Sequence, residues 1–94
     1  MSDGNEKLHD ESNRGARAAA LLAEPMFQEA FSTTERALID KWINAPIRDR
    51  EGHHELLLMV KALRMTHKHV VTVATTGRLA NLQLEQRRKA GKGA

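Results

Sequence analysis

The stretch Ala45–Val71, APIRDREGHHELLLMVKALRMTHKHVV, decides the fold. Asp49 is a residue type that caps helix N-termini, and Glu51 suits a first helical turn, where the helix dipole favours acids. The apolar residues that follow recur every three or four positions, which is the spacing of an amphipathic helix. The stretch therefore predicts a tight turn near Pro46–Asp49 that leads into a long C-terminal helix.

A second helix is predicted on the N-terminal side of this turn. Pro25 suits the first position of a helix, where its missing N–H costs nothing, and it pushes Glu24 out of helical geometry. From Phe27 to Trp42 the apolar residues share one helical face, and Pro46 ends the pattern. Because the connection to the long helix is short, the two helices are expected to lie antiparallel as a hairpin.

The ends of the chain lead to different expectations. Residues 1–12 are polar and acidic, so we expect a disordered N-terminus. Residues 13–23, NRGARAAALLA, are rich in strong helix formers and predict a short leading helix. Residues 87–94 are expected to form a basic, flexible tail, which leaves residues 13–86 as a single helical domain.

The predicted fold class is therefore all-α, with a core made by the apolar stripes of the hairpin and the end of the short leading helix. Gly77 leaves two alternatives for the long helix, because glycine costs about 1 kcal/mol inside a helix. The helix either bends near Thr75–Gly77 or continues and lets another helix approach closely there. The predicted core consists of Leu21, Leu22, Phe27, Phe31, Leu38, Trp42, Leu56, Met59, Val60, Leu63 and Val70.

The long helix outruns its hairpin partner, because about twenty residues cannot cover about forty. Apolar surface beyond the partner predicts self-association, so the expected partner is a second copy in a homo-oligomer. Ala74, Gly77 and Ala80, three apart, would allow a neighbouring helix to come close. The candidate oligomer interface is Val70, Val73, Ala74, Gly77, Ala80 and Leu84.

The net charge of +3 is distributed unevenly along the chain. Residues 61–94 carry eight Lys or Arg and one acid, Glu85. Such a basic segment favours an anionic partner, either nucleic acid or an acidic protein surface. The pattern lacks interleaved aromatics for base stacking, so DNA remains an open alternative partner. The candidate contacts are Lys61, Arg64, Lys68, Arg78, Arg87, Arg88 and Lys89.

No motif for catalysis or metal binding stands out. The chain has no cysteine, and its histidines at 53, 54, 67 and 69 lack the i, i+4 spacing of helical zinc ligands. Capping explains the carboxylates around residue 50, and the glycines form no phosphate-binding loop. We therefore expect no catalytic residue, no metal, no cofactor and no enzymatic activity. His67, on the apolar stripe, is expected to be partly buried.

The sequence also bears on location. The N-terminal residues lack the apolar segment of a secretory signal peptide, and no apolar run approaches the roughly 20 residues of a membrane span. We expect neither secretion by a signal peptide nor contact with a membrane.

Three features carry a resemblance that covers residues 14–86. They are the Leu-Leu-x-x-Pro-x-Phe segment at 21–27, the junction formed by Trp42, Pro46, Asp49 and Glu51, and Gly77 followed by Leu79 and Ala80. This layout resembles small all-helical proteins of tailed bacteriophages that are encoded among head-assembly genes. The resemblance transfers no catalytic residue. It implies a location in the host cytoplasm or the virion, with other phage structural proteins as partners.

The resulting functional hypothesis is a non-enzymatic, self-associating helical protein, serving as a virion, head-morphogenesis or DNA-packaging accessory component. Two alternatives stay open. One is a small nucleic-acid-binding regulator or packaging recognition subunit, and the other is a phage inhibitor of a host protein.

Overall fold

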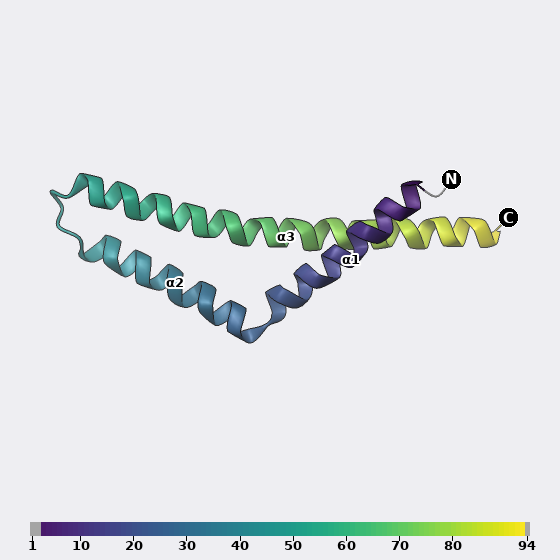
Figure 1. Ribbon diagram of the computed structural model, residues 1–94, viewed down its shortest axis with the longest axis horizontal. Coiled ribbons are helices and arrows are strands. Elements are labelled where there is room, and N and C mark those ends of the chain that lie inside the picture. The colour runs from purple at the N-terminus through teal and green to yellow at the C-terminus, as the bar shows by residue number, and fades with distance from the viewer. Residues whose placement is uncertain (1–2, 94) are drawn as a thin grey trace. The chain divides into compact units, whose positions relative to one another are not determined.

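The computed structural model describes residues 3–93 of the chain and the side chains of residues 4–91. Within that range it contains three α-helices and no strand (Figure 1): α1 (Asp3–Ala23), α2 (Pro25–Asn44) and α3 (Arg50–Gly93). The all-α prediction is therefore confirmed. The chain divides into two compact units, and α3 contributes to both. Unit 1 comprises residues 1–22 and 69–94, and unit 2 comprises residues 23–68.

The boundary between α1 and α2 follows from Pro25. Glu24 is extended, with φ −72° and ψ 122°, and Pro25 occupies the first turn of α2. The Glu24 carboxylate accepts a hydrogen bond from the Phe27 backbone N–H at 3.0 Å, which satisfies one of the free donors at the helix start. The helix start predicted at this proline is confirmed.

The turn between α2 and α3 is also the one expected. The Asp49 backbone N–H donates to the Pro46 carbonyl at 2.9 Å, which closes the turn. The Asp49 side chain accepts from the Gly52 backbone N–H at 2.9 Å, so Asp49 caps α3 as predicted.

Unit 2 is an antiparallel hairpin of α2 and residues 50–68 of α3 (Figure 1). No residue of α2 is buried, and Val60 is the one buried residue among those described in this unit. Met59 and Trp42 were predicted to be core residues, but their exposed fractions are 53% and 44%. The other predicted core residues of this unit are half-buried: Phe27, Phe31, Leu38, Leu56 and Leu63.

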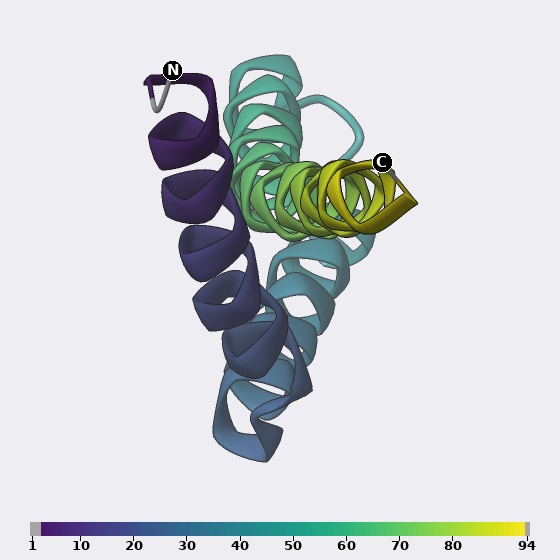
Figure 2. The ribbon, with the colours of Figure 1, turned by 90° about the vertical axis from the view of Figure 1, so that its right-hand side faces the viewer.

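Unit 1 is a pair formed by α1 and the C-terminal half of α3, which run in opposite directions (Figure 1) and lie next to each other in the view along α3 (Figure 2). Arg87 donates to Asn5 near the start of α1, and the Ser12 hydroxyl donates to the Asn81 side-chain oxygen at 3.5 Å. The buried residues of this unit are Leu8, Gly15, Ala18, Gly77 and Ala80. Of the predicted core residues here, Leu22 and Val70 are half-buried, and Leu21 is exposed.

The two helices of unit 1 make their closest contact at Gly15 and Gly77. A Cβ on Gly15 would lie 3.0 Å from the Gly77 nitrogen and 3.1 Å from the Val73 carbonyl oxygen. A Cβ on Gly77 would lie 2.8 Å from the Glu11 carbonyl oxygen and 3.0 Å from the Gly15 nitrogen. Each glycine thus packs on the glycine of the other helix and on the carbonyl that lies four residues before that second glycine. No side chain fits at either position.

Several expectations about the chain ends were wrong. α1 begins at Asp3, so residues 3–12 are helical rather than disordered, and α3 continues to Gly93 through the expected flexible tail. Residues 1–2 and 94 lie outside the described residues. The chain forms two units rather than one domain spanning 13–86. α3 is unbroken at Gly77, so the close-approach alternative is the correct one.

Replacing Gly77 by alanine tests this contact. Alanine is favoured over glycine inside a helix by about 1 kcal/mol, but here its methyl group meets backbone that cannot rotate away. We expect a net destabilisation of about 1–2 kcal/mol, seen in thermal unfolding as a midpoint lower by about 4–15 °C.

Gly91→Ala is the matched control, because a Cβ at Gly91 meets nothing within 4 Å. That variant should be as stable as the wild-type chain or slightly more stable. Equal behaviour of the two variants would show that the contact of Gly15 and Gly77 is not tight in solution.

Candidate functional site

An apolar groove lies along one side of the unit 2 hairpin. It has a volume of about 270 Å³ and is lined by Ile39, Trp42, Leu57, Val60 and Arg64. A second hollow of about 330 Å³ shares Ile39 and extends along α2 to Phe31. We call the surface formed by these two hollows the hairpin groove.

Helical spacing explains why these residues meet. Ile39 and Trp42 are three apart on α2, and Leu57, Val60 and Arg64 are separated by three and four on α3. Residues with such spacings lie on one face of a helix. Because the hairpin is antiparallel, the two faces converge along its length.

The groove is edged by an ion pair. Arg64 Nε donates to the Glu35 carboxylate at 2.9 Å, and the side chains are 60% and 25% exposed. The hydrogen bond from Arg64 lowers the pKa of Glu35, although partial burial opposes the shift. The same bond raises the pKa of Arg64. Because water screens a pair this exposed, its main effect is to hold Arg64 at the groove.

His67 lies between two aromatic rings of α2. Its ring centroid is 4.5 Å from that of Phe31 and 6.2 Å from that of Phe27, and it stacks on the latter at 12°. His67 is half-buried, as the sequence predicted. An imidazole packed on two phenyl rings serves as part of the hairpin contact, at the end of unit 2 opposite the turn.

His53 ties the turn end of the hairpin together. Its Nε2 lies 3.1 Å from the Trp42 carbonyl oxygen, one of the last carbonyls of α2, and its ring meets the indole edge-on at a centroid distance of 5.7 Å. A carbonyl in the last turn of a helix has no partner within the helix, so this contact satisfies it. It also orients the indole beside the groove.

Many apolar side chains of unit 2 remain in contact with solvent. Ile47 in the turn is 91% exposed, and Ile43, near the end of α2, is 64% exposed. A monomeric soluble protein seldom exposes large apolar residues in such density. The exposed large apolar residues of unit 2 are Met26, Trp42, Ile43, Ile47, Leu57, Leu58, Met59 and Met65.

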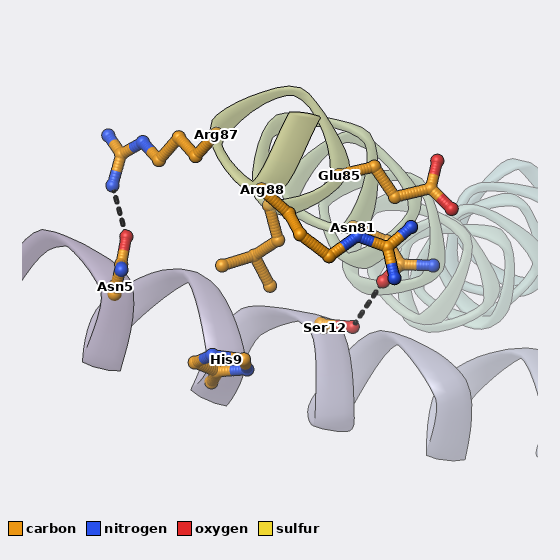
Figure 3. Close-up of a pocket in the computed structure, with 8 residues that line it drawn as sticks. Asn5, His9, Ser12, Asn81, Glu85, Arg87 and Arg88 are labelled. Atoms are coloured by element: carbon orange, nitrogen blue, oxygen red, sulfur yellow. Dashed lines mark hydrogen bonds between the residues drawn. The ribbon is translucent and has the colours of Figure 1, made fainter. Parts of the chain in front are cut away.

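Unit 1 carries a polar cleft between α1 and the end of α3 (Figure 3). Its volume is about 450 Å³. The guanidinium groups of Arg87 and Arg88 stand over it, with His9 below and Glu85 as the one acid among its lining residues. This excess of positive charge suits an anion. The full lining is Asn5, His9, Ser12, Asn81, Leu84, Glu85, Arg87 and Arg88.

The predicted anionic-partner contacts do not form one strip. Arg64 is engaged by Glu35, and Arg87 donates to Asn5. Lys61 and Lys68, seven residues apart on α3, share one exposed face. The remaining three are also exposed on α3: Arg78, Arg88 and Lys89.

Two residues of the predicted oligomer interface are occupied within the chain, which corrects the prediction for these two. Gly77 and Ala80 are buried in unit 1, and α1 packs on them because it is about ten residues longer than expected. The small residues on α3 do permit a close helix contact, but the helix that makes it is α1. The other four residues of the predicted interface are half-buried: Val70, Val73, Ala74 and Leu84.

The hairpin groove was not predicted as a surface. Trp42 and Val60 were assigned to the core and Arg64 to an anionic contact, whereas Ile39 and Leu57 were not singled out. The run Leu56–Met59 places apolar residues all around α3, and this feature could have indicated a helix with a second apolar side.

Neither a metal cluster nor a membrane-spanning helix is found in the structure. Residues 3–93 contain no group of three His, Cys, Asp or Glu placed to hold a metal ion. No helix among them is long and apolar enough to cross a membrane. Comparison of the chain with models of protein families, with curated proteins and with solved structures gave no match.

The pairing of Glu35 with Arg64 predicts a pH dependence. Because folding lowers the pKa of Glu35, the ionised carboxylate stabilises the fold above its ordinary value of 4.5, and this contribution is lost as the pH falls through the lowered pKa. Glu35→Gln should therefore unfold at a lower temperature than the wild-type chain at pH 7, and the difference should shrink as the pH falls through the lowered pKa.

Glu55→Gln is the control, since Glu55 belongs to the same hairpin, is exposed and has no ion pair among the described residues. It should not show this pH-dependent difference. A deficit of Glu35→Gln that stays constant as the pH falls through the lowered pKa would contradict the role given to the ion pair.

Proposed function

We propose that this chain is a non-enzymatic helical assembly protein that acts by associating with further copies of itself. The observation that supports the proposal is the hairpin of unit 2, in which only Val60 is buried among the described residues. Helices in water are stabilised chiefly by packing an apolar face, and a pair of helices with one buried residue lacks most of that contribution.

Association would supply the missing burial. Covering the exposed half of a Leu, Ile or Met side chain contributes about 1 kcal/mol, so the exposed apolar residues of the hairpin together represent a substantial driving force. Charge does not oppose it, because unit 2 carries seven Lys or Arg and seven Asp or Glu. Copies of a hairpin without net charge do not repel one another over distance.

Light scattering coupled to size-exclusion chromatography tests the proposal. We expect a defined oligomer whose mass holds from low to high salt and does not depend on added duplex DNA, because burial of apolar surface is not screened by ions. A monomer at all protein concentrations would refute self-association.

The setting we propose is a phage particle, as a virion, head-morphogenesis or DNA-packaging accessory component. This part rests on the resemblance carried by residues 14–86. Mass spectrometry of purified particles, and of assembly intermediates, from cells that express the chain would test it. The chain should be present in one of the two at a constant ratio to the major structural protein, and its absence from both would remove this setting.

One observation favours a second candidate function, nucleic-acid binding. All of the net charge of the chain resides in unit 1, which has eight Lys or Arg and five Asp or Glu. The polar cleft of that unit adds two guanidiniums and one imidazole on one surface (Figure 3). Phosphate oxygens accept hydrogen bonds from all of these groups.

Fluorescence anisotropy with labelled duplex DNA tests this candidate. If the cleft binds phosphate, the double variant Arg87→Ala/Arg88→Ala should weaken binding, and the slope of log K against log salt should fall by about 2, since each contact contributes about 0.9. Lys41→Ala/Arg48→Ala in unit 2 is the control that removes the same charge elsewhere. No binding at low salt, or equal loss in both variants, would exclude the cleft.

A further inference from the structure

We propose that the hairpin groove is the seat of a second copy of this chain, with α2 of one copy lying against α3 of the other. The inference rests on the proposed self-association and adds the surface, the helices that meet and their orientation by charge. It concerns one side of the hairpin only. Substitutions on the two sides can therefore distinguish this interface from non-specific association of exposed apolar residues.

The apolar residues that flank the groove belong to one side. Ile43 is four residues beyond Ile39 on α2, so it extends the same face towards the turn. Leu57 lines the groove and is 43% exposed, whereas Met59 is 53% exposed but two positions further on, about 200° around the helix. The hairpin therefore has two exposed apolar sides on α3, and the groove lies on the side of Leu57.

Charges on the two helices are of opposite sign. α2 carries three acids and two bases, whereas residues 50–68 of α3 carry two acids and four bases. Within the described part of the hairpin, Glu35 and Arg64 form the single ion pair. Both helices also carry exposed charges of the other sign. The exposed charges without an ion pair in the described hairpin are Glu29, Arg36, Asp40 and Lys41 on α2, and Arg50, Glu51, Glu55, Lys61 and Lys68 on α3.

These charges select the pairing. If α3 met α3 of the other copy, the lysines at 61 and 68 would face one another, which is unfavourable across an interface. If α2 of each copy lies on α3 of the other, a helix of net charge −1 meets a helix segment of net charge +2 in each half of the dimer. Such an arrangement is an isologous dimer, in which both copies use the same patch.

A second copy fits the groove better than an unrelated acidic helix would. Each hairpin supplies both the acidic and the basic helix, and the hairpin as a whole is neutral. Two antiparallel helices with one buried residue are half of a four-helix bundle, and a second hairpin supplies the other half.

Trp42 provides a direct reporter. It is the only tryptophan of the chain, it lines the groove, and it is 44% exposed in a single copy. If a second copy covers the groove, the fluorescence emission of Trp42 should move to shorter wavelength as the protein concentration rises through the dissociation constant. A spectrum that stays constant while the mass doubles would place the interface elsewhere.

The decisive comparison is between Leu57→Glu and Met59→Glu in the full chain. A carboxylate at Leu57 would be buried against the partner. The dissociation constant of the dimer, measured by analytical ultracentrifugation, should therefore rise by about 30-fold or more. The same carboxylate at Met59 faces away from the groove and should change the constant by less than about threefold. Circular dichroism checks that both variants keep the helix content of the wild-type chain.

The outcomes separate the two proposals. A wild-type chain that is monomeric refutes self-association and this inference together. An oligomer that tolerates Leu57→Glu, or that is disrupted equally by Met59→Glu, leaves self-association standing and overturns the groove as its surface.

Charge reversal tests the pairing with variants that touch only exposed residues. One variant carries Glu29→Lys/Asp40→Lys, and the other Lys61→Glu/Lys68→Glu. Each alone should dimerise more weakly than the wild-type chain, because α2 and α3 of the partner then carry the same sign. Mixed together, the two should form a heterodimer. Variants that each dimerise as tightly as the wild-type chain would overturn the pairing of α2 with α3.

Discussion

The contact between Gly15 and Gly77 is the constraint on which unit 1 depends. Two helix backbones approach so closely there that neither position has room for a methyl group. Among the described residues around it, only Ala18, Ala80 and Leu8 are buried, so this unit holds together by backbone proximity rather than by large side chains. Close packing of this kind gains many weak dispersion contacts along both helices. It also explains how a polar, acidic N-terminus can be helical, because Leu8 is carried onto α3 by the same pairing.

Unit 2 is built in the opposite manner. Its geometry is defined at the ends, where Pro25, Asp49 and His53 set the helix starts and close the turn. Between these points the two helices share an ion pair and the packing of His67 on two phenyl rings, but they bury only Val60. The contacts at the two ends therefore fix the antiparallel pairing of the helices, but few side chains are buried between them. The groove is open because the space beside the two helices is not filled by side chains of the same chain.

Charge and exposed apolar side chains are distributed unevenly between the two units. Unit 1 has the net positive charge and a cleft rich in hydrogen-bond donors, whereas unit 2 is neutral and exposes most of the large apolar side chains that face solvent. Electrostatic attraction acts over distance and weakens with salt, while apolar burial needs contact and does not. Under the proposed function, unit 2 associates with further copies and unit 1 remains for an anionic partner.

The helix boundaries at Pro25, Pro46 and Asp49 could be predicted from sequence, because proline geometry and N-terminal capping act within a few residues. The all-α class followed from the same local rules and from apolar spacing. The helix over residues 3–12 could not be predicted, since a single leucine in a polar segment becomes significant only when another helix covers it. The groove residues were missed for a related reason. Spacing on one helix shows which residues share a face, but the pairing of the helices determines which faces meet. Only the long-range packing placed Gly77 against another helix of the same chain. The same packing left Trp42 and Leu57 exposed to solvent.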